Sequence, residues 1–413
     1  MKILFIHVYY TNKQISGVNQ MLYSTIDTLN KGDNEAHIFA TDEKPYIDPH
    51  YKYQKFFPKS YSRWDKKGIK NYIKSLFKYI YNKEAKTNLD KLLDEFQPDI
   101  VHIHSVWELT YSIIEPIKKR NIPIVYTAHD PNFCCPGISF VGKNFCNKCK
   151  GLNTLPCILN KCGKNNFFVS IYFAIKALIE RMLCPVNYFE KIIVPSKETM
   201  DFMSSFGISK EKFIVNENFL PKEDLIQEPN YQNMNYFLYA GGLNNKKGVM
   251  TLLKAMSVLP KDIKLHIVGN EDRKCQANDF IKNNNLNNVK YLGILNKEQI
   301  QEEYKNCISV IMPSECFETF GMINIEAAVY GKPSISSNIG GLPDVVEDGK
   351  TGLIFEPGNV EQLKECILKY WNNRDLAIEH GKAAREKTLN QYNEDLYFKK
   401  LIKIYEKVIN NAK

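Results

Sequence analysis

Strand-like and helix-like segments alternate along almost all of the 413 residues, and this alternation restricts the fold more than any other feature. Short apolar runs occur in the first half at KILFIHVYY, EAHIFA, PDIVHIHS, IPIVYTAHD, KIIVPS and KFIVNENFL. The second half also contains short apolar runs at similar spacing, namely NYFLYAGG, KLHIVG, VKYLGIL, CISVIMPS, PSISSN and TGLIF. Strands that alternate with helices favour parallel sheets covered on both faces. The two sets therefore predict an α/β protein with two doubly wound, Rossmann-like domains.

The domain limits follow from where these patterns stop. We expect an N-terminal domain over 1–220, a polar linker over 221–235 and a C-terminal domain over 236–390. A final helix over 391–413 is expected to pack back on the N-terminal domain. No stretch is long and apolar enough to cross a membrane, and the first residues lack the shape of a secretory signal. We therefore expect a cytoplasmic protein.

The net charge of +9 arises within residues 1–220, and the densest basic stretch is 52–86. The simpler interpretation is a solvated helix face. The alternative is a patch for an anionic partner, which would place the protein peripherally at the inner face of the membrane. The apolar segment 165–183 has the same two interpretations, a core helix or, as the alternative, an interfacial membrane helix. No nucleic-acid-binding motif is present, so we expect no nucleic-acid partner.

Two glutamates stand eight residues apart in ETFGMINIE, within an otherwise apolar stretch. If Gly321 opens a helix, the backbone amides of Met322 and Ile323 form an anion site at its start. Glu318 and Glu326 would then lie on either side of that site. Carboxylates cannot bind a phosphate, but they accept hydrogen bonds from sugar hydroxyls. The alternative is a helix-capping Glu318 and a solvent-facing Glu326.

Three further patterns lie at expected strand ends. In YAGGLNNKKG, Lys247 follows a glycine pair and could neutralise a diphosphate. His129 ends the strand IVYTAHD, where a structural histidine is as common as a catalytic one. Gly17 opens a helix after the first strand but belongs to no GxGxxG motif.

The four patterns together resemble glycosyltransferase family 4, a retaining group with the GT-B fold, in which two Rossmann-like domains face each other across a cleft. The run EAAVYGKPSISSNIGGLPDVVEDGKTGLIFEPG is similar to the C-terminal signature of that family. The resemblance implies transfer of a sugar from a nucleotide-diphosphate donor, of the UDP or GDP type, to a saccharide or lipid-linked saccharide. It also implies a context of surface polysaccharide biosynthesis.

The same resemblance assigns roles to single residues. Glu318 would contact the donor sugar and Glu326 the ribose, while Met322 and Ile323 hold the diphosphate and Lys247 neutralises it. His129 would touch the sugar near the reacting centre, Gly17 would let the first loop approach both substrates, and the base would lie near Gly269 and Gly293. The acceptor would attack from the face that the diphosphate leaves, and no metal or cofactor is required for catalysis.

Three departures from the family pattern stand out. Gly242 occupies a position where arginine is usual, Asp344 one where glutamate is usual, and the first loop has a single glycine. Gly242 is the one feature that favours a degenerate protein that only binds a sugar nucleotide. A sugar-nucleotide epimerase of the same fold is the other alternative.

Cysteines gather in an expected insertion over 134–162. The spacing C-x2-C-x7-C-x4-C joins Cys146, Cys149, Cys157 and Cys162, and four thiolates so arranged suit a structural, tetrahedral zinc ion. The alternative is a set of free, buried thiols. A similar insertion in some family members implies a structural role.

Overall fold

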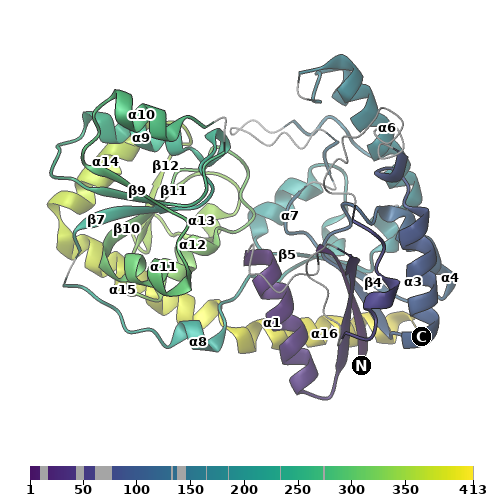
Figure 1. Ribbon diagram of the computed structural model, residues 1–413. Helices are drawn as coiled ribbons and strands as arrows, with labels where there is room; N and C mark the ends of the chain where they lie inside the picture. Colours follow the sequence, from purple (N-terminus) through teal and green to yellow (C-terminus); the bar gives the residue numbers. More distant parts are fainter. Residues whose placement is uncertain are drawn as a thin grey trace.

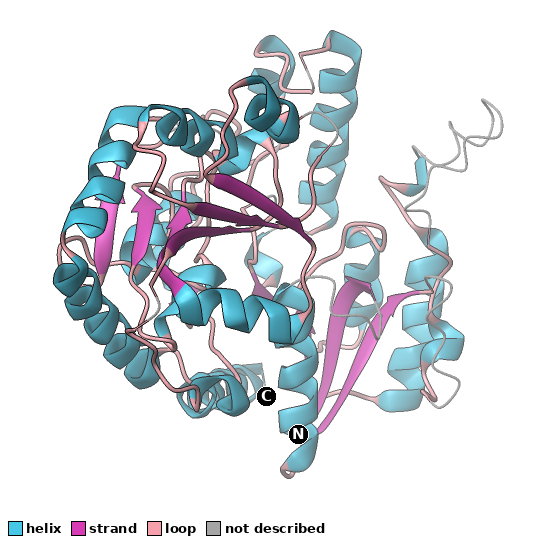
Figure 2. Ribbon diagram, turned by 60° about the vertical axis from the view of Figure 1, so that its left-hand side comes forward, coloured by secondary structure: helices cyan, strands magenta, loops and turns pink. Residues whose placement is uncertain are grey.

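A computed structural model describes residues 1–9, 17–42, 51–60, 77–131, 134–136, 146–163, 165–184, 186–232, 234–272 and 275–412. Two parallel six-stranded sheets organise the chain, each flanked by helices (Figures 1 and 2). The predicted α/β fold with two doubly wound domains is thus confirmed. No helix of the described residues is both long and apolar enough to span a bilayer.

The N-terminal sheet has the order β2-β1-β3-β4-β5-β6. Its strands are β1 (Lys2–Tyr9), β2 (Glu35–Thr41), β3 (Ile100–Ile103), β4 (Ile124–Thr127), β5 (Lys191–Val194) and β6 (Phe213–Val215). Its helices are α1 (Gly17–Lys31), α3 (Lys83–Phe96), α4 (Ile114–Lys119), α5 (Leu155–Leu159), α6 (Phe167–Leu183) and α7 (Lys197–Ser204). The strand order reverses direction between β1 and β3, which is where open parallel sheets bind ligands.

The C-terminal sheet has the order β12-β11-β10-β7-β8-β9, so its reversal point lies between β7 and β10. Its strands are β7 (Tyr236–Ala240), β8 (Leu265–Val268), β9 (Val289–Gly293), β10 (Cys307–Met312), β11 (Ser334–Ser337) and β12 (Gly352–Phe355). Its helices are α9 (Val249–Val258), α10 (Ala277–Asn283), α11 (Lys297–Asn306), α12 (Met322–Ala328), α13 (Leu342–Val345), α14 (Val360–Asn372) and α15 (Arg374–Gln391).

The strands are buried because helices cover both faces of each sheet. Every residue of β3, β4, β7 and β10 is buried, as the continuous apolar runs in the sequence predict. Short helix α8 (Lys222–Leu225) lies in the segment between the two sheets.

Helix α16 (Glu394–Ala412) follows the C-terminal domain in sequence but packs in the N-terminal core. In Figure 1 it runs in yellow from one domain beneath the other. Its buried side chains Tyr397, Leu401 and Tyr405 join the cluster that contains the strand residues of β1 and β3. The Tyr405 hydroxyl lies 2.6 Å from His102 Nδ1, and His102 Nε2 lies 2.6 Å from Thr127 Oγ1. These contacts tie the last helix to β3 and β4.

Candidate functional site

Lys247 and Glu318 form an ion pair at the reversal point of the C-terminal sheet. Lys247 follows β7 in a short 3-10 turn, and Glu318 lies in the loop after β10, so the neighbouring strands bring the two loops together. The Ser314 hydroxyl donates to Glu318 Oε1 at 2.7 Å. Burial disfavours the charged ammonium of Lys247, but the Glu318 carboxylate outweighs burial and raises the pKa of Lys247. Lys247 is therefore a retained positive charge at this strand edge.

Glycines leave bare backbone at the ends of β7, β8 and β9. Gly269 has φ +141°, and a Cβ added there would lie 1.8 Å from the carbonyl oxygen of Gly241. The Gly269 amide donates to the Gly293 carbonyl at 2.8 Å, so the two glycines expected near the base are adjacent. At Gly269 the glycine is thus required by the close approach of the Gly241 backbone, whereas nothing lies within 4 Å of a Cβ added at Gly293, so the backbone there is open to a flat ligand.

Helix α12 begins after Gly321, whose φ of +92° favours glycine. Amides at the start of a helix have no acceptor within the helix, and Met322 and Ile323 occupy those positions. Glu326 lies one turn further on, where its Oε2 accepts a 2.8 Å hydrogen bond from the Tyr304 hydroxyl. Burial raises the pKa of Glu326, and Tyr304 partly offsets that rise.

Loops from both domains meet at His129. The Thr319 hydroxyl, next to Glu318, donates to the His129 carbonyl at 2.9 Å. The Thr199 hydroxyl of α7 donates to the Thr319 carbonyl at 3.2 Å. Asp344 Oδ2 accepts from the Glu198 amide at 3.0 Å, so the residue that replaces the usual glutamate caps a helix of the other domain. The Glu318 loop and His129 are therefore neighbours in space.

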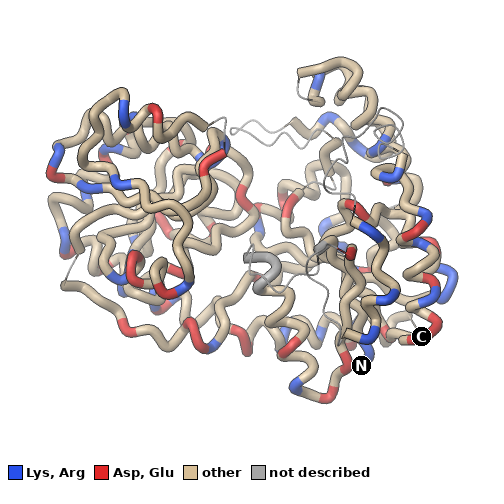
Figure 3. The backbone as a smooth tube through the Cα atoms, viewed as in Figure 1, with Lys and Arg blue, Asp and Glu red and all other residues tan. Residues whose placement is uncertain are grey.

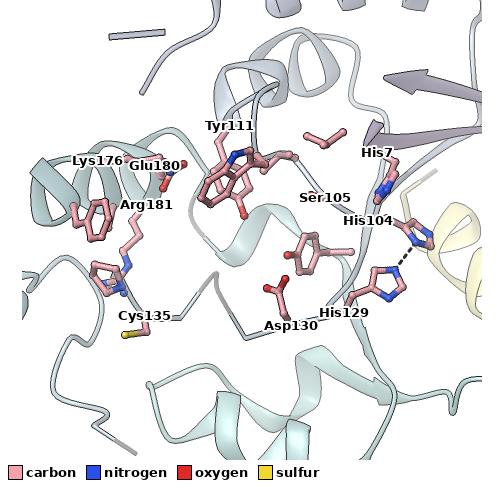
Figure 4. A pocket seen from close by; sticks show the side chains of 17 residues that line it. His7, His104, Ser105, Tyr111, His129, Asp130, Cys135, Lys176, Glu180 and Arg181 are labelled. Atoms are coloured by element: carbon pink, nitrogen blue, oxygen red, sulfur yellow. Dashed lines mark hydrogen bonds and ion pairs between the residues drawn. The ribbon is translucent and has the colours of Figure 1, made fainter. Parts of the chain in front are cut away.

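A cavity of about 340 Å³ lies at the reversal point of the N-terminal sheet (Figure 4). Ends of β1, β3 and β4 contribute His7, His104 and His129 to it, and α6 contributes Lys176 and Glu180. Trp107 adds an indole ring that is half exposed, with Lys176 Nζ 5.9 Å from the ring centre. Aromatic rings, amines and carboxylates are groups that bind saccharides through C–H faces and hydroxyls.

His104 and His129 of this cavity are neutral at physiological pH. His104 Nδ1 and His129 Nε2 share a hydrogen bond of 2.7 Å, shown as a dashed line in Figure 4. Burial lowers the pKa of His129 to about 3, and the neighbouring His7 adds to this effect. Burial also lowers the pKa of His104 well below its usual value. His129 can therefore exchange hydrogen bonds with a ligand without adding a positive charge.

Gly17 opens α1, as the sequence predicts. Residues 10–16, which precede it in the first loop, lie outside the described part of the chain, as do residues 61–76 of the basic stretch. Gly242 is exposed, and its carbonyl accepts from the Tyr239 hydroxyl at 2.9 Å. Lys246 is exposed and makes no ion pair with a described residue.

The cysteines of the insertion surround a second cavity, of about 250 Å³. It is lined by Cys135, Cys146, Cys149, Cys157 and Cys162 together with Pro136, Pro156 and Asn160. Burial raises the pKa of Cys157 to about 12. Across the described residues, no three His, Cys, Asp or Glu side chains are arranged as a metal site. The four predicted ligands are thus brought around one space as thiols and not as a formed coordination shell.

Sequence reasoning missed several residues of the site. Ser314 and Tyr304 bond the two glutamates, and Trp107 and Lys176 line the N-terminal cavity. None of them belongs to a motif, so they can be identified only from their positions in the folded structure. The two glutamates have no basic neighbour in sequence, yet Glu318 is paired, because Lys247 lies 71 residues earlier.

Comparison with known proteins places these features in context. Residues 15–223 match the family model "Glycosyltransferase Family 4", and residues 222–387 match "Glycosyl transferases group 1". An uncharacterised glycosyltransferase of Methanocaldococcus jannaschii is 32% identical over 177 residues, which are 43% of this chain and 49% of that protein. O-antigen chain mannosyltransferase C of Escherichia coli is 27% identical over 181 residues, 43% of this chain and 48% of its own length. These matches thus span about half the length of each relative.

Solved structures share the whole architecture. Sucrose-phosphate synthase of Thermosynechococcus elongatus superimposes with a TM-score of 0.69 at 16% identity, over 99% of both chains. Anabaena HepE in complex with UDP gives a TM-score of 0.65 at 15% identity, over 98% of this chain and 100% of its own. At these identities the likeness shows the fold, which is GT-B.

Proposed function

Since this chain belongs to glycosyltransferase family 4, we propose that it transfers a hexose, with retention, from a nucleotide-diphosphate sugar to a saccharide or lipid-linked saccharide. One observation carries the proposal most. Lys247, Glu318 and Ser314 meet at the reversal point of the C-terminal sheet, and Thr319 joins the same loop to His129 of the other domain. A donor held at the C-terminal sheet would thereby present its sugar to the N-terminal cavity.

The donor site would use groups whose positions suit each part of a nucleotide sugar. The diphosphate would take the amides of Met322 and Ile323 and the ammonium of Lys247, which Glu318 holds charged in the free protein. When the phosphates bind Lys247, the Glu318 carboxylate loses its ion pair and can accept hydrogen bonds from the hydroxyls of the sugar. Glu326 would accept the ribose hydroxyls, and the base would lie on the backbone of Gly269 and Gly293. The binding of UDP by HepE supports a uridine donor.

Sugar transfer would depend on positive groups that stabilise the negative charge of the leaving diphosphate. As the glycosidic C–O bond to the diphosphate breaks, negative charge grows on the β-phosphate, and Lys247 and the α12 amides stabilise it. The acceptor hydroxyl attacks the anomeric carbon from the same face and gives its proton to the departing phosphate. His129 would hold a sugar hydroxyl as a neutral imidazole. No cofactor or catalytic metal is needed in this scheme, because these groups supply the positive charge.

The surface-polysaccharide context is the finer part of the proposal. An O-antigen mannosyltransferase among the relatives and the CapM glycosyltransferase of capsular polysaccharide biosynthesis in Staphylococcus aureus support it. An acceptor carried on a lipid would also explain why the protein should work at the inner face of the membrane.

The test has two stages. Thermal shift against UDP-, GDP-, ADP-, TDP- and CMP-sugars should single out one nucleotide, and Glu326→Ala should lose the effect. Release of nucleoside diphosphate in the presence of saccharide acceptors should then be abolished by Glu318→Ala. The matched control is Glu315→Ala in the same loop, whose carboxylate bonds Thr251 and not the site. Conversion of the donor to an isomer without acceptor would instead identify an epimerase, and donor binding without any turnover would identify a degenerate binder.

We propose in addition that Cys146, Cys149, Cys157 and Cys162 hold a structural zinc ion. The common cavity supports this, since thiolates could move inward once the ion displaces their protons. Protein purified without chelator should contain about one zinc per chain, which Cys146→Ser with Cys149→Ser should remove and Cys366→Ser should not. A metal-free wild-type protein with the same melting temperature after zinc addition would refute the site.

A further inference from the structure

Helix α6 carries an exposed apolar stripe on its outer side. Phe168, Ile175 and Met182 recur every seven residues, which puts them on one stripe of the helix. Their exposed fractions are 78%, 46% and 63%. The opposite face is buried and carries the small residues Ser170, Ala174 and Ala177. The core interpretation of 165–183 therefore applies only to the inner side of α6, where Phe173 and Leu183 are also packed.

The neighbouring helix α5 extends this apolar surface. It packs on α6 through Cys157 and Ile158, which contact the Ala174 region. Leu155 and Leu159 are 58% and 71% exposed on the side away from that contact. Residues 146–184, without residue 164, which is not described, are called here the α5–α6 module. Figure 1 shows α6 at the outer edge of the N-terminal domain, so a large flat partner can reach it.

The charge of this region is strongly one-sided. Residues 131–184 contain seven lysines and arginines and a single acidic residue, Glu180. Glu180 is paired with Lys176 and faces the cavity. Lys148, Lys150 and Lys161 are exposed and have no ion pair with any described residue. Figure 3 colours the lysines and arginines of the chain blue.

Four of the six described lysines of the basic stretch 52–86 differ in this respect, because Lys52, Lys55, Lys78 and Lys86 are paired with carboxylates. Lys55 is paired with Glu95 at 2.8 Å and Lys86 with Glu115 at 2.6 Å. Their charges are thus partly neutralised within the protein. The α5–α6 module therefore combines exposed apolar side chains with lysines that no described carboxylate pairs.

We propose that the α5–α6 module docks on the surface of an anionic lipid bilayer. Exposed Phe, Ile, Leu and Met side chains would enter the boundary between headgroups and acyl chains, while the lysines contact anionic headgroups. A second copy of the chain suits the surface less, because a symmetric contact would bring two positive surfaces together. Apolar side chains alone would fit many partners, and the unpaired lysines select the anionic bilayer.

Docking in this way would couple the membrane to the cavity beside His129. The inner side of α6 lines that cavity with Lys176 and Glu180, while its outer side carries the apolar stripe. A lipid-linked saccharide could then enter the cavity while its lipid stays in the bilayer. This consequence rests on the proposed function, whereas docking itself does not.

Vesicle co-sedimentation tests the docking directly with the full chain. The wild-type protein should sediment with vesicles of phosphatidylglycerol and phosphatidylcholine, and much less with vesicles of phosphatidylcholine alone. The variant F168S/I175S/M182S should weaken partition by at least about tenfold, and K148Q/K150Q/K161Q should reduce binding to the anionic vesicles only. The matched control is I226S/V258S/I294S, which removes three apolar side chains of similar exposure elsewhere and should bind as the wild type does.

Three results would overturn the proposal. The first is wild-type protein that stays in the supernatant at low salt. The second is an equal loss of vesicle binding in F168S/I175S/M182S and in its control. The third is a wild-type dimer, detected by light scattering, that F168S/I175S/M182S dissociates and the other variants do not. Thermal shift with nucleotide sugars should be the same for all variants. Failure of docking is thereby separated from failure of the proposed transferase site.

Discussion

At the scale of single residues, the pair of Lys247 and Glu318 holds the free site in a defined electrostatic state. Each charge satisfies the other until a donor arrives, so neither is left unpaired in a half-buried place. The pair also shows why the two residues should be tested separately. Lys247 would act on the leaving phosphate, and Glu318 on the sugar.

Replacing Lys247 by methionine should lower kcat by about a hundredfold to a thousandfold, because charge on the leaving phosphate loses its stabilising partner. Steady-state assays of nucleoside diphosphate release would measure it. Lys246→Met is the matched control, since Lys246 is adjacent but exposed and makes no ion pair with the described residues. Equal losses in both variants would contradict a specific role for Lys247.

A substitution at Gly242 should have the opposite effect and increase donor affinity. A Cβ at this position would lie 3.7 Å from its nearest neighbour, Asn244 Nδ2, which is ordinary contact. Gly242→Arg should therefore fold normally and tighten donor binding by about tenfold, through a bidentate contact to the diphosphate. Titration of the nucleotide sugar by calorimetry would detect this change. Unchanged affinity would mean that the phosphates do not pass beside residue 242.

At the scale of elements, the sequence was sufficient for the strands and most of the helices. All twelve apolar runs form strands, and the expected helices at α1, α12 and α16 are present. Continuous apolar runs and glycine-terminated helical patterns are local signals, so they can be read directly. The orientation of α6 could not be predicted, because its sequence is apolar on nearly every side.

The candidate site was predictable only where motifs name its residues. Glu318, Glu326, Lys247 and His129 were found in this way, and their roles remain predictions. Their partners depend on which strands lie side by side. Ser314, Tyr304 and Trp107 are common residue types at unremarkable positions, and nothing local separates them from surface residues.

The histidines at the ends of β3 and β4 predict how stability depends on pH. Burial lowers the pKa of both His102 and His129 to about 3. In the unfolded chain these side chains bind protons below about pH 6.5, whereas in the folded protein they stay neutral. The free energy of unfolding should thus be highest above pH 6.5 and fall as the pH drops toward 3. The loss would be about 1.4 kcal/mol per pH unit for each histidine.

Urea denaturation at pH 7, 6 and 5 would measure this slope. His102→Asn should reduce the slope by the share of one histidine, whatever its effect on stability at pH 7. A variant with an unchanged slope would show that His102 is already protonated in the folded protein.

At the scale of the whole molecule, α16 and a few loop contacts join the two domains. The hydroxyl of Tyr405 is the polar centre of the α16 contact, because it bonds a fully buried histidine. Tyr405→Phe should lower the free energy of unfolding by about 1–3 kcal/mol, since His102 Nδ1 loses its partner. Tyr188→Phe, whose hydroxyl bonds no described residue, is the control and should change it little. Equal effects would place the stabilisation in packing alone.

The position of α16 in the N-terminal core also determines when that domain can complete its folding during translation. Domains generally fold from the N-terminus as they emerge, but this N-terminal core contains a helix that is translated after the entire second sheet. Until α16 has been translated, the surface of β1 and β3 that it will cover stays exposed to solvent or is bound by a chaperone. A premature stop codon before residue 394 would therefore damage the first domain to be made, although every residue of its sheet would be present.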